Sequence, residues 1–422
     1  MKRSPEQTAW LVLFASLFTC CALAVGIPAA ALTFYNTATS EAVINVKLQA
    51  GQMSVWRPTQ TDDDPPSVVS LDGYEISEGS RIVLAADSTG LLTVLDNASS
   101  PARPLLTVQL YPNTQLRVER ARLPRFHAGA VGDEFVFRLT GGRIQATAHA
   151  ADRKLNLRVL SDYGSVTSAM PGVYVIERAN DALWLTVVEG SASVATRSDD
   201  MSLNLSSGQR TAVTNSAIAG VLPPPANLIR NGRFQDDIAS AWQVEAVVAQ
   251  SGAPPGTVRI VEEGKSRSLL LERMGEGLGW GRTGVIQSLD AGVSRQRDLR
   301  VVLDFAILFQ ELPVCASVGS ECPLFVSIAW RDSKGGAREW IQGFYAAGSP
   351  QMQPGALILP DAILTNPQRK HIKVPLGQRM RWESENLLPY LPDVRTIEAV
   401  KIYAEGHAVR TQIHAVELLV LN

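Results

Sequence analysis

The pattern of hydrophobic and polar positions changes once along this chain, near residue 35. From Ala9 to Phe34 the sequence contains no charged residue, and a helix needs about 20 consecutive apolar residues to cross a bilayer. Beyond this run, apolar and polar residues alternate over short stretches that end in turn signals, as in 134–139, 155–159 and 184–188. Alternation with period two predicts β-strands, and no later segment repeats convincingly at the helical period. The pattern predicts one apolar helix followed by an all-β chain folded as sandwiches.

The residues around the apolar run indicate how it lies in a membrane. Lys2 and Arg3 precede it, and basic residues on the short leading side place that side in the cytoplasm. We therefore expect residues 1–8 to be a cytoplasmic stub and residues 9–34 to be a transmembrane signal-anchor. The bulk of the chain would lie outside the cytoplasm, as in a single-pass protein of the cell membrane. Pro28 falls near the outer end, where the helix can end.

A cleaved signal peptide is the alternative interpretation of the same run. The segment Ala29–Ala31 fits the small-residue pattern of a cleavage site. However, the run is longer than the ~7–15 residues of a usual signal core, which favours a retained anchor. Lipoprotein processing at Cys20 or Cys21 is disfavoured, because Phe18 and Thr19 are bulkier than the residues that usually precede such a cysteine.

The length of the chain and one proline-rich segment predict how the β region divides. At 422 residues the chain is long enough for two or three domains. The stretch from Ala217 to Asn227 contains three consecutive prolines, which form a stiff, extended segment without backbone donors for a sheet. We therefore expect a first β domain over residues 41–216, a linker over 217–226 and a second β domain over 227–422.

Charge and cysteine content narrow the possible partners and the compartment. The formal net charge is −2, without the basic character of a nucleic-acid-binding protein. Cys315 and Cys322 lie close together after the predicted anchor, and in an oxidising compartment this pattern predicts a disulfide that closes a small loop. A zinc site is disfavoured because it needs four ligands and no other cysteine or histidine is near in sequence.

Catalytic and cofactor motifs are not evident in the sequence. No P-loop, zinc-protease or serine-hydrolase motif occurs. Residues 279–284 (GWGRTG) match G-x-G-x-x-G, but they follow no strand–helix unit and lead into a predicted strand, so a dinucleotide-binding interpretation fails. The five histidines are scattered, and an acid–base role needs a converging partner. These observations predict a protein that is not an enzyme and that carries no cofactor or metal. The one exception considered is a structural calcium ion held with help from Asp236.

Three tryptophans are candidates for ligand contact. Sugar-binding faces use aromatic rings, against which the C–H faces of a pyranose pack. Trp280, Trp340 and Trp382 lie near glycine or charged residues, which makes them the candidate ligand-binding residues. The alternative for each is packing in a hydrophobic core, which we expect for Trp242 and Trp330.

The first predicted domain resembles a known family. Residues 46–56 (VKLQAGQMSVW), 164–175 (GSVTSAMPGVYV), 187–194 (VVEGSASV) and 203–213 (LNLSSGQRTAV) follow the strand and turn rhythm of the FecR-type extracytoplasmic domain. The resemblance implies a β sandwich and a role in signal transduction or surface sensing. In the best-known members, a cytoplasmic domain before the membrane helix controls a sigma factor. Only eight residues precede the apolar run here, so the resemblance supports the outer module and not direct sigma-factor control.

The second predicted domain resembles a different fold. Residues 227–234 (NLIRNGRF), 284–289 (GVIQSL) and 413–420 (IHAVELLV) resemble segments of the galactose-binding-like jelly roll, which many carbohydrate-binding modules share. The resemblance implies a jelly-roll β sandwich that binds a ligand rather than transforming it.

Together these features predict a membrane-anchored bacterial surface protein that acts by binding. The ligand would be a cell-surface glycan or a partner protein in a sensory complex. The alternative is a structural envelope or assembly subunit whose β domains dock on other chains without binding a small ligand.

The retained anchor has a direct test. We expect the intact mass of the mature protein, purified from membranes and measured by mass spectrometry, to include residues 1–31. A mature mass that lacks these residues would replace the anchor with a cleaved signal.

Overall fold

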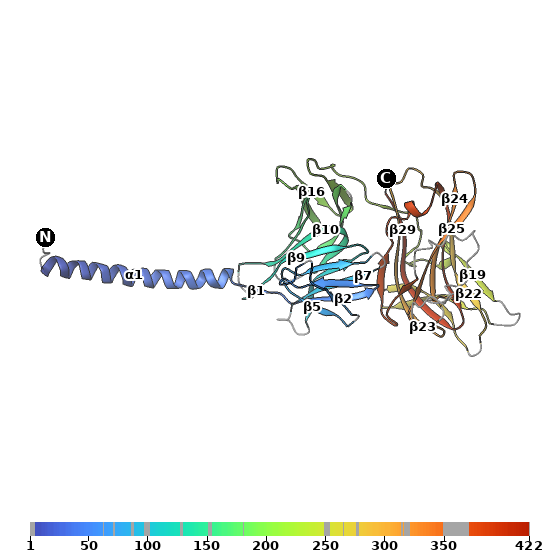
Figure 1. The fold of residues 1–422 in the computed structure, drawn as a ribbon, viewed down its shortest axis with the longest axis horizontal. Coiled ribbons are helices and arrows are strands. Elements are labelled where there is room, and N and C mark those ends of the chain that lie inside the picture. The colour runs from blue at the N-terminus through green and yellow to red at the C-terminus, as the bar shows by residue number, and fades with distance from the viewer. Residues whose placement is uncertain are drawn as a thin grey trace.

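The N-terminal helix is the longest element of the structure. The computed structural model describes residues 5–421 except 62, 71, 86–87, 97–101, 127–129, 151–153, 180, 249–253, 265, 276–277, 314, 316–320 and 349–370. Helix α1 (Pro5–Thr37) projects away from the β region (Figure 1). Its segment Ala9–Thr37 contains an 18-residue stretch with a mean hydropathy of 2.3 that is not buried against the rest of the chain. By length and composition, this helix can cross a membrane.

Helix α1 does not end near Pro28. It continues through this residue to Thr37. Lys2 and Arg3, which suggested the orientation, lie outside the described residues. At the far end, Tyr35 stacks on Phe126, with ring centroids 4.7 Å apart. The helix therefore runs directly into the β region, without a flexible spacer.

The first β unit consists of two sheets, I and II, that share one long strand. Strand β10 (Asp133–Ala148) pairs through its first half in sheet I and through its second half in sheet II. The bend between the halves requires Gly142, whose φ is +80° and where a Cβ would come within 2.5 Å of the Thr114 backbone.

The strands of sheet I lie in the order β4 (Ser67–Val68), β3 (Met53–Trp56), β6 (Arg81–Leu84), β9 (Gln115–Pro124), β10, β11 (Leu155–Leu160), β12 (Gly164–Ser168), β15 (Ser191–Thr196) and β16 (Ser202–Ser206), and β1 (Thr39–Glu41) also pairs with β9. The strands of sheet II lie in the order β5 (Tyr74–Ile76), β2 (Ile44–Ala50), β7 (Thr89–Asp96), β8 (Arg103–Leu110), β10, β13 (Gly172–Ala179), β14 (Ala182–Glu189) and β17 (Gln209–Val213).

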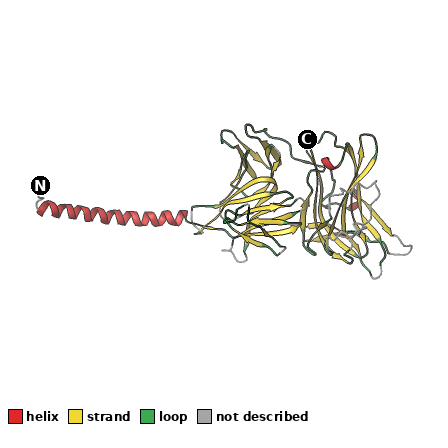
Figure 2. Ribbon diagram, viewed as in Figure 1, coloured by secondary structure: helices red, strands yellow, loops and turns green. Residues whose placement is uncertain are grey.

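The second β unit is a two-layer sandwich (Figure 2). Sheet III has the order β20 (Thr257–Glu263), β21 (Ser266–Arg273), β29 (Val409–Leu421), β23 (Asp298–Gln310) and β27 (Met380–Glu383), with β18 (Ala226–Asn227) paired to β29. Sheet IV has the order β19 (Gln243–Val248), β22 (Gly281–Gly292), β28 (Val394–Gly406), β24 (Leu324–Asp332), β25 (Ala337–Tyr345) and β26 (Ile372–Lys373). Two short 3₁₀ helices, η1 (Ile238–Ser240) and η2 (Leu388–Tyr390), complete the unit.

Each β unit has its own hydrophobic core. The core of the first unit includes Ile44, Phe135 and Tyr174, and the core of the second includes Phe305 and Trp330. In the first unit, buried and more exposed residues alternate along the strands, as in β2 and β11. This is the pattern expected when one face of a strand packs on a core and the other does not. The prediction of an all-β fold after one apolar helix is therefore confirmed.

The segment over residues 217–226 is held more closely than expected. The backbone of Leu222 exchanges hydrogen bonds with Arg210 on β17, and Ala219 donates to Ala212 at 2.9 Å. Leu222 and Ala219 have backbone N–H groups that can donate, so the predicted lack of backbone donors applies only to the prolines. After the prolines, β18 pairs with β29. The segment is thus fixed to sheet II at one end and to sheet III at the other.

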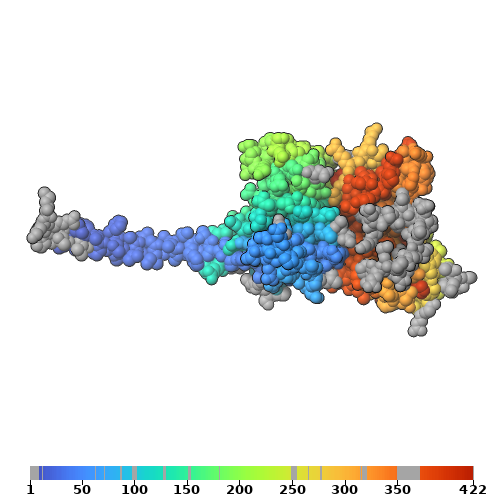
Figure 3. Space-filling model, in the orientation of Figure 1, coloured from blue at the N-terminus to red at the C-terminus, as the bar shows by residue number. Residues whose placement is uncertain are grey.

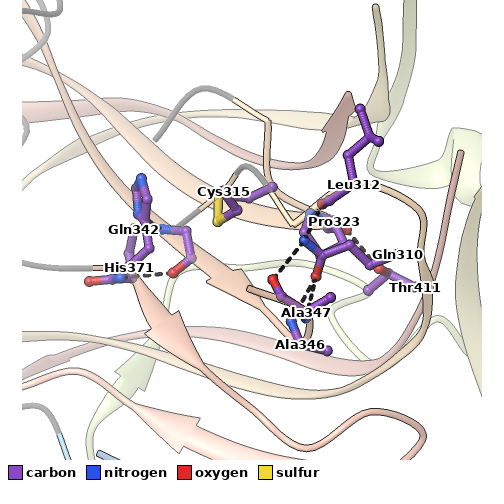
Figure 4. The surroundings of a disulfide bond; sticks show 11 residues. Gln310, Leu312, Cys315, Pro323, Gln342, Ala346, Ala347, His371 and Thr411 are labelled. Carbon is purple, nitrogen blue, oxygen red and sulfur yellow. Dashed lines mark hydrogen bonds between the residues drawn. A yellow bond between two sulfur atoms is a disulfide. The ribbon is translucent and has the colours of Figure 1, made fainter. Parts of the chain in front are cut away.

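Cys315 and Cys322 form the predicted disulfide, and both residues are buried. Figure 4 shows the bond beside the side chain of Gln310, which donates to the Leu312 carbonyl at 2.8 Å and accepts from the Ala346 backbone at 2.8 Å. Hydrogen bonds to neighbouring backbone therefore hold the region around the disulfide.

The disulfide predicts a specific pattern of alkylation. Under denaturing conditions without reductant, we expect iodoacetamide to modify only the free thiols of Cys20 and Cys21, and all four cysteines after reduction. The number of adducts is read from the intact mass. Four adducts without reductant would contradict the disulfide.

Candidate functional site

Two of the three candidate tryptophans lie in the core of the second unit. Trp340 is 1% exposed and Trp382 is 2% exposed, and the ring of Trp382 packs edge-on against Phe344 at a centroid distance of 5.0 Å. A fully buried ring has no face to offer to a sugar, so the structure places both residues in the alternative role of core packing. The charged neighbours Arg381 and Glu383 misled the interpretation, because adjacent residues on a strand point to opposite faces.

Trp280 is only partly buried. Its Nε1 donates to Oε1 of Glu405 at 3.1 Å, and Arg282 pairs with the same carboxylate at 2.9 Å. The guanidinium of Arg282 also lies over the Tyr403 ring, 4.7 Å from its centroid. Burial raises the pKa of Glu405, although Arg282 opposes the effect. These four residues form a compact polar and aromatic cluster where β22 meets β28.

The largest concentration of buried charge lies between the two units. The two units abut, as Figure 3 shows, and ion pairs join sheet II of the first unit to sheet III of the second. Arg143 on β10 contacts Glu383 on β27 at 2.5 Å, and Arg300 on β23 contacts Glu177 on β13 at 2.6 Å. Both ion pairs join one unit to the other.

The two ion pairs belong to one network, which we call the junction network. Arg143 is also 3.8 Å from Glu177, and Arg300 is 3.9 Å from Glu383. Asp298 contacts Arg300 at 2.8 Å. The side chain of Glu383 is only 3% exposed and that of Arg300 is 11% exposed. Because isolated buried charges are very costly, this close mutual pairing is what permits the two faces to meet.

The titration behaviour of these groups reflects their burial. Burial acts to raise the pKa of Glu177, but Arg300 and Arg143 outweigh it and hold the pKa below its ordinary value. Burial raises the pKa of Glu383 despite its arginine neighbours. Burial also raises the pKa of Tyr111, on the same face of sheet II, to about 12. Burial lowers the pKa of Arg210 to about 10, and its guanidinium lies over the Trp184 ring at 4.0 Å.

A cavity of about 680 Å³ adjoins the junction network. We call it the junction cleft. One part is polar and is lined by Arg143, Gln145, Arg381, Glu383 and Glu417. The apolar part is lined by valines of β13 and β14, by Leu419 of β29 and by the prolines of the connecting segment: Val173, Val175, Val187, Val188, Pro224 and Pro225. A cavity of this size between two units, with convergent polar groups and an apolar wall, is a typical ligand-binding location.

The sequence interpretation missed this site. Arg143, Glu177, Arg300 and Glu383 stand at outward positions of alternating strands, where a charged residue is ordinarily solvated. Their burial depends on the docking of two units that are far apart along the chain. Nothing in the local pattern around these residues distinguishes them from solvated surface charges.

The residues considered for metal binding or acid–base chemistry do not converge. Among the described residues, no group of three or more His, Cys, Asp or Glu side chains is placed to hold a metal ion. Asp236 lies in a turn that Asn231 organises by hydrogen bonds to its backbone N and O at 3.1 Å. His407 contacts Glu321 at 2.9 Å, and His149 contacts Thr107 at 2.9 Å. These histidines therefore lie in separate environments.

Comparisons with known proteins give only weak likenesses. No family model matches the sequence, and no curated protein matches it. Solved structures similar to parts of the chain include a protein assigned as an anti-sigma factor from Parabacteroides distasonis, at 14% identity and a TM-score of 0.25, covering 34% of this chain. This chain spans 59% of that protein's length.

Two further solved structures resemble other stretches. One is a family 11 carbohydrate-binding module of a cellulosomal cellulase from Clostridium thermocellum, at 12% identity and a TM-score of 0.27, covering 46% of this chain and 94% of that one. The other is the enzymatically active domain of tailspike protein 4 from bacteriophage CBA120, also at 12% identity and a TM-score of 0.27, covering 46% of this chain and 21% of that one. Scores this low do not establish a common fold, so no ligand follows from them.

We expect the removal of a buried charge from the junction network to destabilise the protein more than the removal of a surface charge. Glu383→Gln removes the close counter-charge of Arg143, whose other carboxylate partner, Glu177, is 3.8 Å away. Because this leaves a buried guanidinium poorly paired, we expect the variant to lower the free energy of unfolding by about 3–5 kcal/mol. The matched control is Glu398→Gln, which removes an exposed partner of Arg331 and should cost about 0–1 kcal/mol. Urea unfolding of the full chain in detergent measures both. Equal, small effects would show that the network does not stabilise the docked units.

Proposed function

We propose that this protein is a membrane-anchored extracytoplasmic binding protein whose ligand, a glycan, occupies the junction cleft. The observation that carries the proposal is the cleft itself: polar side chains of both units and an apolar wall converge on about 680 Å³. Helix α1 supplies the anchor, with an apolar segment long enough to cross a bilayer. The protein binds and does not transform its ligand.

The lining of the cleft suits a sugar. A pyranose has apolar C–H faces that pack on aliphatic side chains, and Val175 and Leu419 offer such a wall. Its hydroxyl groups need donors and acceptors together, which the amide of Gln145 and the carboxylate of Glu417 supply. A ligand bound there would touch sheets II and III at once and would stabilise the docked arrangement over any other.

Trp280 is the second candidate glycan contact. Its partly buried ring stands beside Arg282 and Glu405, which gives an apolar surface next to polar groups. A structural envelope or assembly subunit is the competing function. It would use the same surfaces to hold partner chains and would show no affinity for glycans.

The test is glycan binding by the full chain in detergent, measured on a panel of cell-wall and extracellular polysaccharide fragments. We expect saturable binding that Gln145→Ala weakens by about tenfold, the effect of losing ~1.4 kcal/mol of hydrogen bonding. The matched control is Gln115→Ala on the exposed face of β9 in sheet I, which should leave affinity unchanged.

The variant Trp280→Ala separates the two candidate positions. If it weakens binding while Gln145→Ala does not, the glycan site is the Trp280 cluster and the cleft assignment is wrong. If no glycan on the panel binds while partner chains co-purify with the full protein, the assembly-subunit function replaces the proposal.

A further inference from the structure

A second hollow, of about 290 Å³, lies beside the junction cleft on the outer face of sheet III. Its charged lining is strongly unbalanced. Four arginines line it, together with His414, but only one carboxylate, that of Asp304. The four arginines are Arg233, Arg267, Arg379 and Arg381. A concave surface with this excess of guanidinium groups attracts anions.

Two of the four arginines already have close partners. Arg379 makes a bidentate contact with Asp304, at 2.7 and 2.6 Å. Arg267 lies 3.3 Å from Glu262 and donates to the Gln235 carbonyl. These two guanidiniums contribute charge to the hollow, but their main hydrogen bonds are made within the protein.

The other two arginines are incompletely satisfied. Arg381 and Arg233 share the single carboxylate of Glu417, at 3.5 and 3.7 Å, whereas a close charge-assisted hydrogen bond is about 2.7–2.9 Å long. Arg381 also hydrogen bonds to Tyr111. Its Nε is buried and donates to no acceptor within the described part of the chain. The side chain of Arg233 is 74% exposed. Both guanidinium groups therefore make only long contacts with the carboxylate of Glu417, and Glu383 also attracts Arg381.

Arg233 and Arg381 also line the junction cleft. They stand where the two cavities adjoin, so a group bound between them would belong to a molecule that extends into the cleft. We propose that Arg233 and Arg381 bind the oxyanion of an acidic sugar whose neutral body occupies the junction cleft. The oxyanion is a carboxylate or a phosphate ester, both of which match the planar fork of a guanidinium. This inference rests on the proposed glycan binding in the cleft. It adds that the glycan carries a negative charge.

Three sugars that differ only at C6 test the charge requirement. Galactose, galacturonic acid and galactose 6-phosphate are titrated calorimetrically into the full chain in detergent. We expect at least one acidic sugar to bind about tenfold or more tightly than galactose, with a preference that weakens as salt screens the partly exposed site. The acidic sugar that binds better identifies carboxylate or phosphate as the natural group.

The variant Arg233→Gln locates the effect. Because this side chain is mostly exposed, its loss should leave the fold intact and remove the preference for the acidic sugar. The matched control is Arg120→Gln, an exposed arginine of the first unit that pairs with Glu134, and it should leave the preference unchanged. An acidic preference that survives Arg233→Gln would overturn the proposal.

His414 provides an independent signal from the hollow. Burial, and then the charge of Arg379, lowers the pKa of this imidazole, while Asp304 and Glu263 oppose the effect. An oxyanion bound nearby would raise that pKa, which an NMR titration of the ring protons measures with and without the acidic sugar. An unchanged value at saturating ligand would place the anion elsewhere and contradict the proposal.

The failures of the two proposals are distinguishable. If neutral glycans bind in the cleft and the acidic sugars bind no better, the oxyanion site is wrong and the glycan function stands. If neither the neutral panel nor the acidic sugars bind, both are wrong.

Discussion

The junction network is the interaction on which the arrangement of the protein depends. Arg143, Glu177, Arg300 and Glu383 are removed from water when sheet II meets sheet III, and their desolvation is offset only if every charge meets its partner. Sliding one sheet over the other would separate these charges from their partners while they stay removed from water. The network therefore favours one docked arrangement and penalises its neighbours. Apolar contact alone would discriminate between them less sharply, because it is non-directional.

The cleft and the second hollow follow from that docking. The connecting segment pairs with β17 on one side and continues into β18 on the other, so its prolines close one side of the space beside the network. Arg381 takes part in all three features: it lines both cavities and it lies next to Tyr111 and Glu383 at the network. A ligand that contacts Arg381 is thus coupled to the docking of the units through a single side chain.

The parts of the structure that the sequence predicted are those set by local pattern. The apolar run, the alternation of β11 and β14 and the close pair Cys315 and Cys322 each depend on neighbours in sequence, and each appears as expected. Pro28 offered a possible end for the apolar helix, but α1 continues past it to Thr37. The positions of the tryptophans depend on the fold and not on neighbouring residues in the sequence. Trp382 and its neighbour Glu383 are one residue apart, yet one packs in a core and the other joins two units, a difference that only the fold determines.

The most direct test of this account is a distance measurement between the two units. Nitroxide labels on Ser202→Cys in β16 and Lys334→Cys in the turn after β24, with Cys20 and Cys21 replaced by alanine, report the separation by double electron–electron resonance in a membrane mimetic. The account predicts a single narrow distance distribution, because the buried charges permit one docked arrangement. A broad or multiple distribution would show that the units move independently, and the junction cleft would then not exist as a defined site.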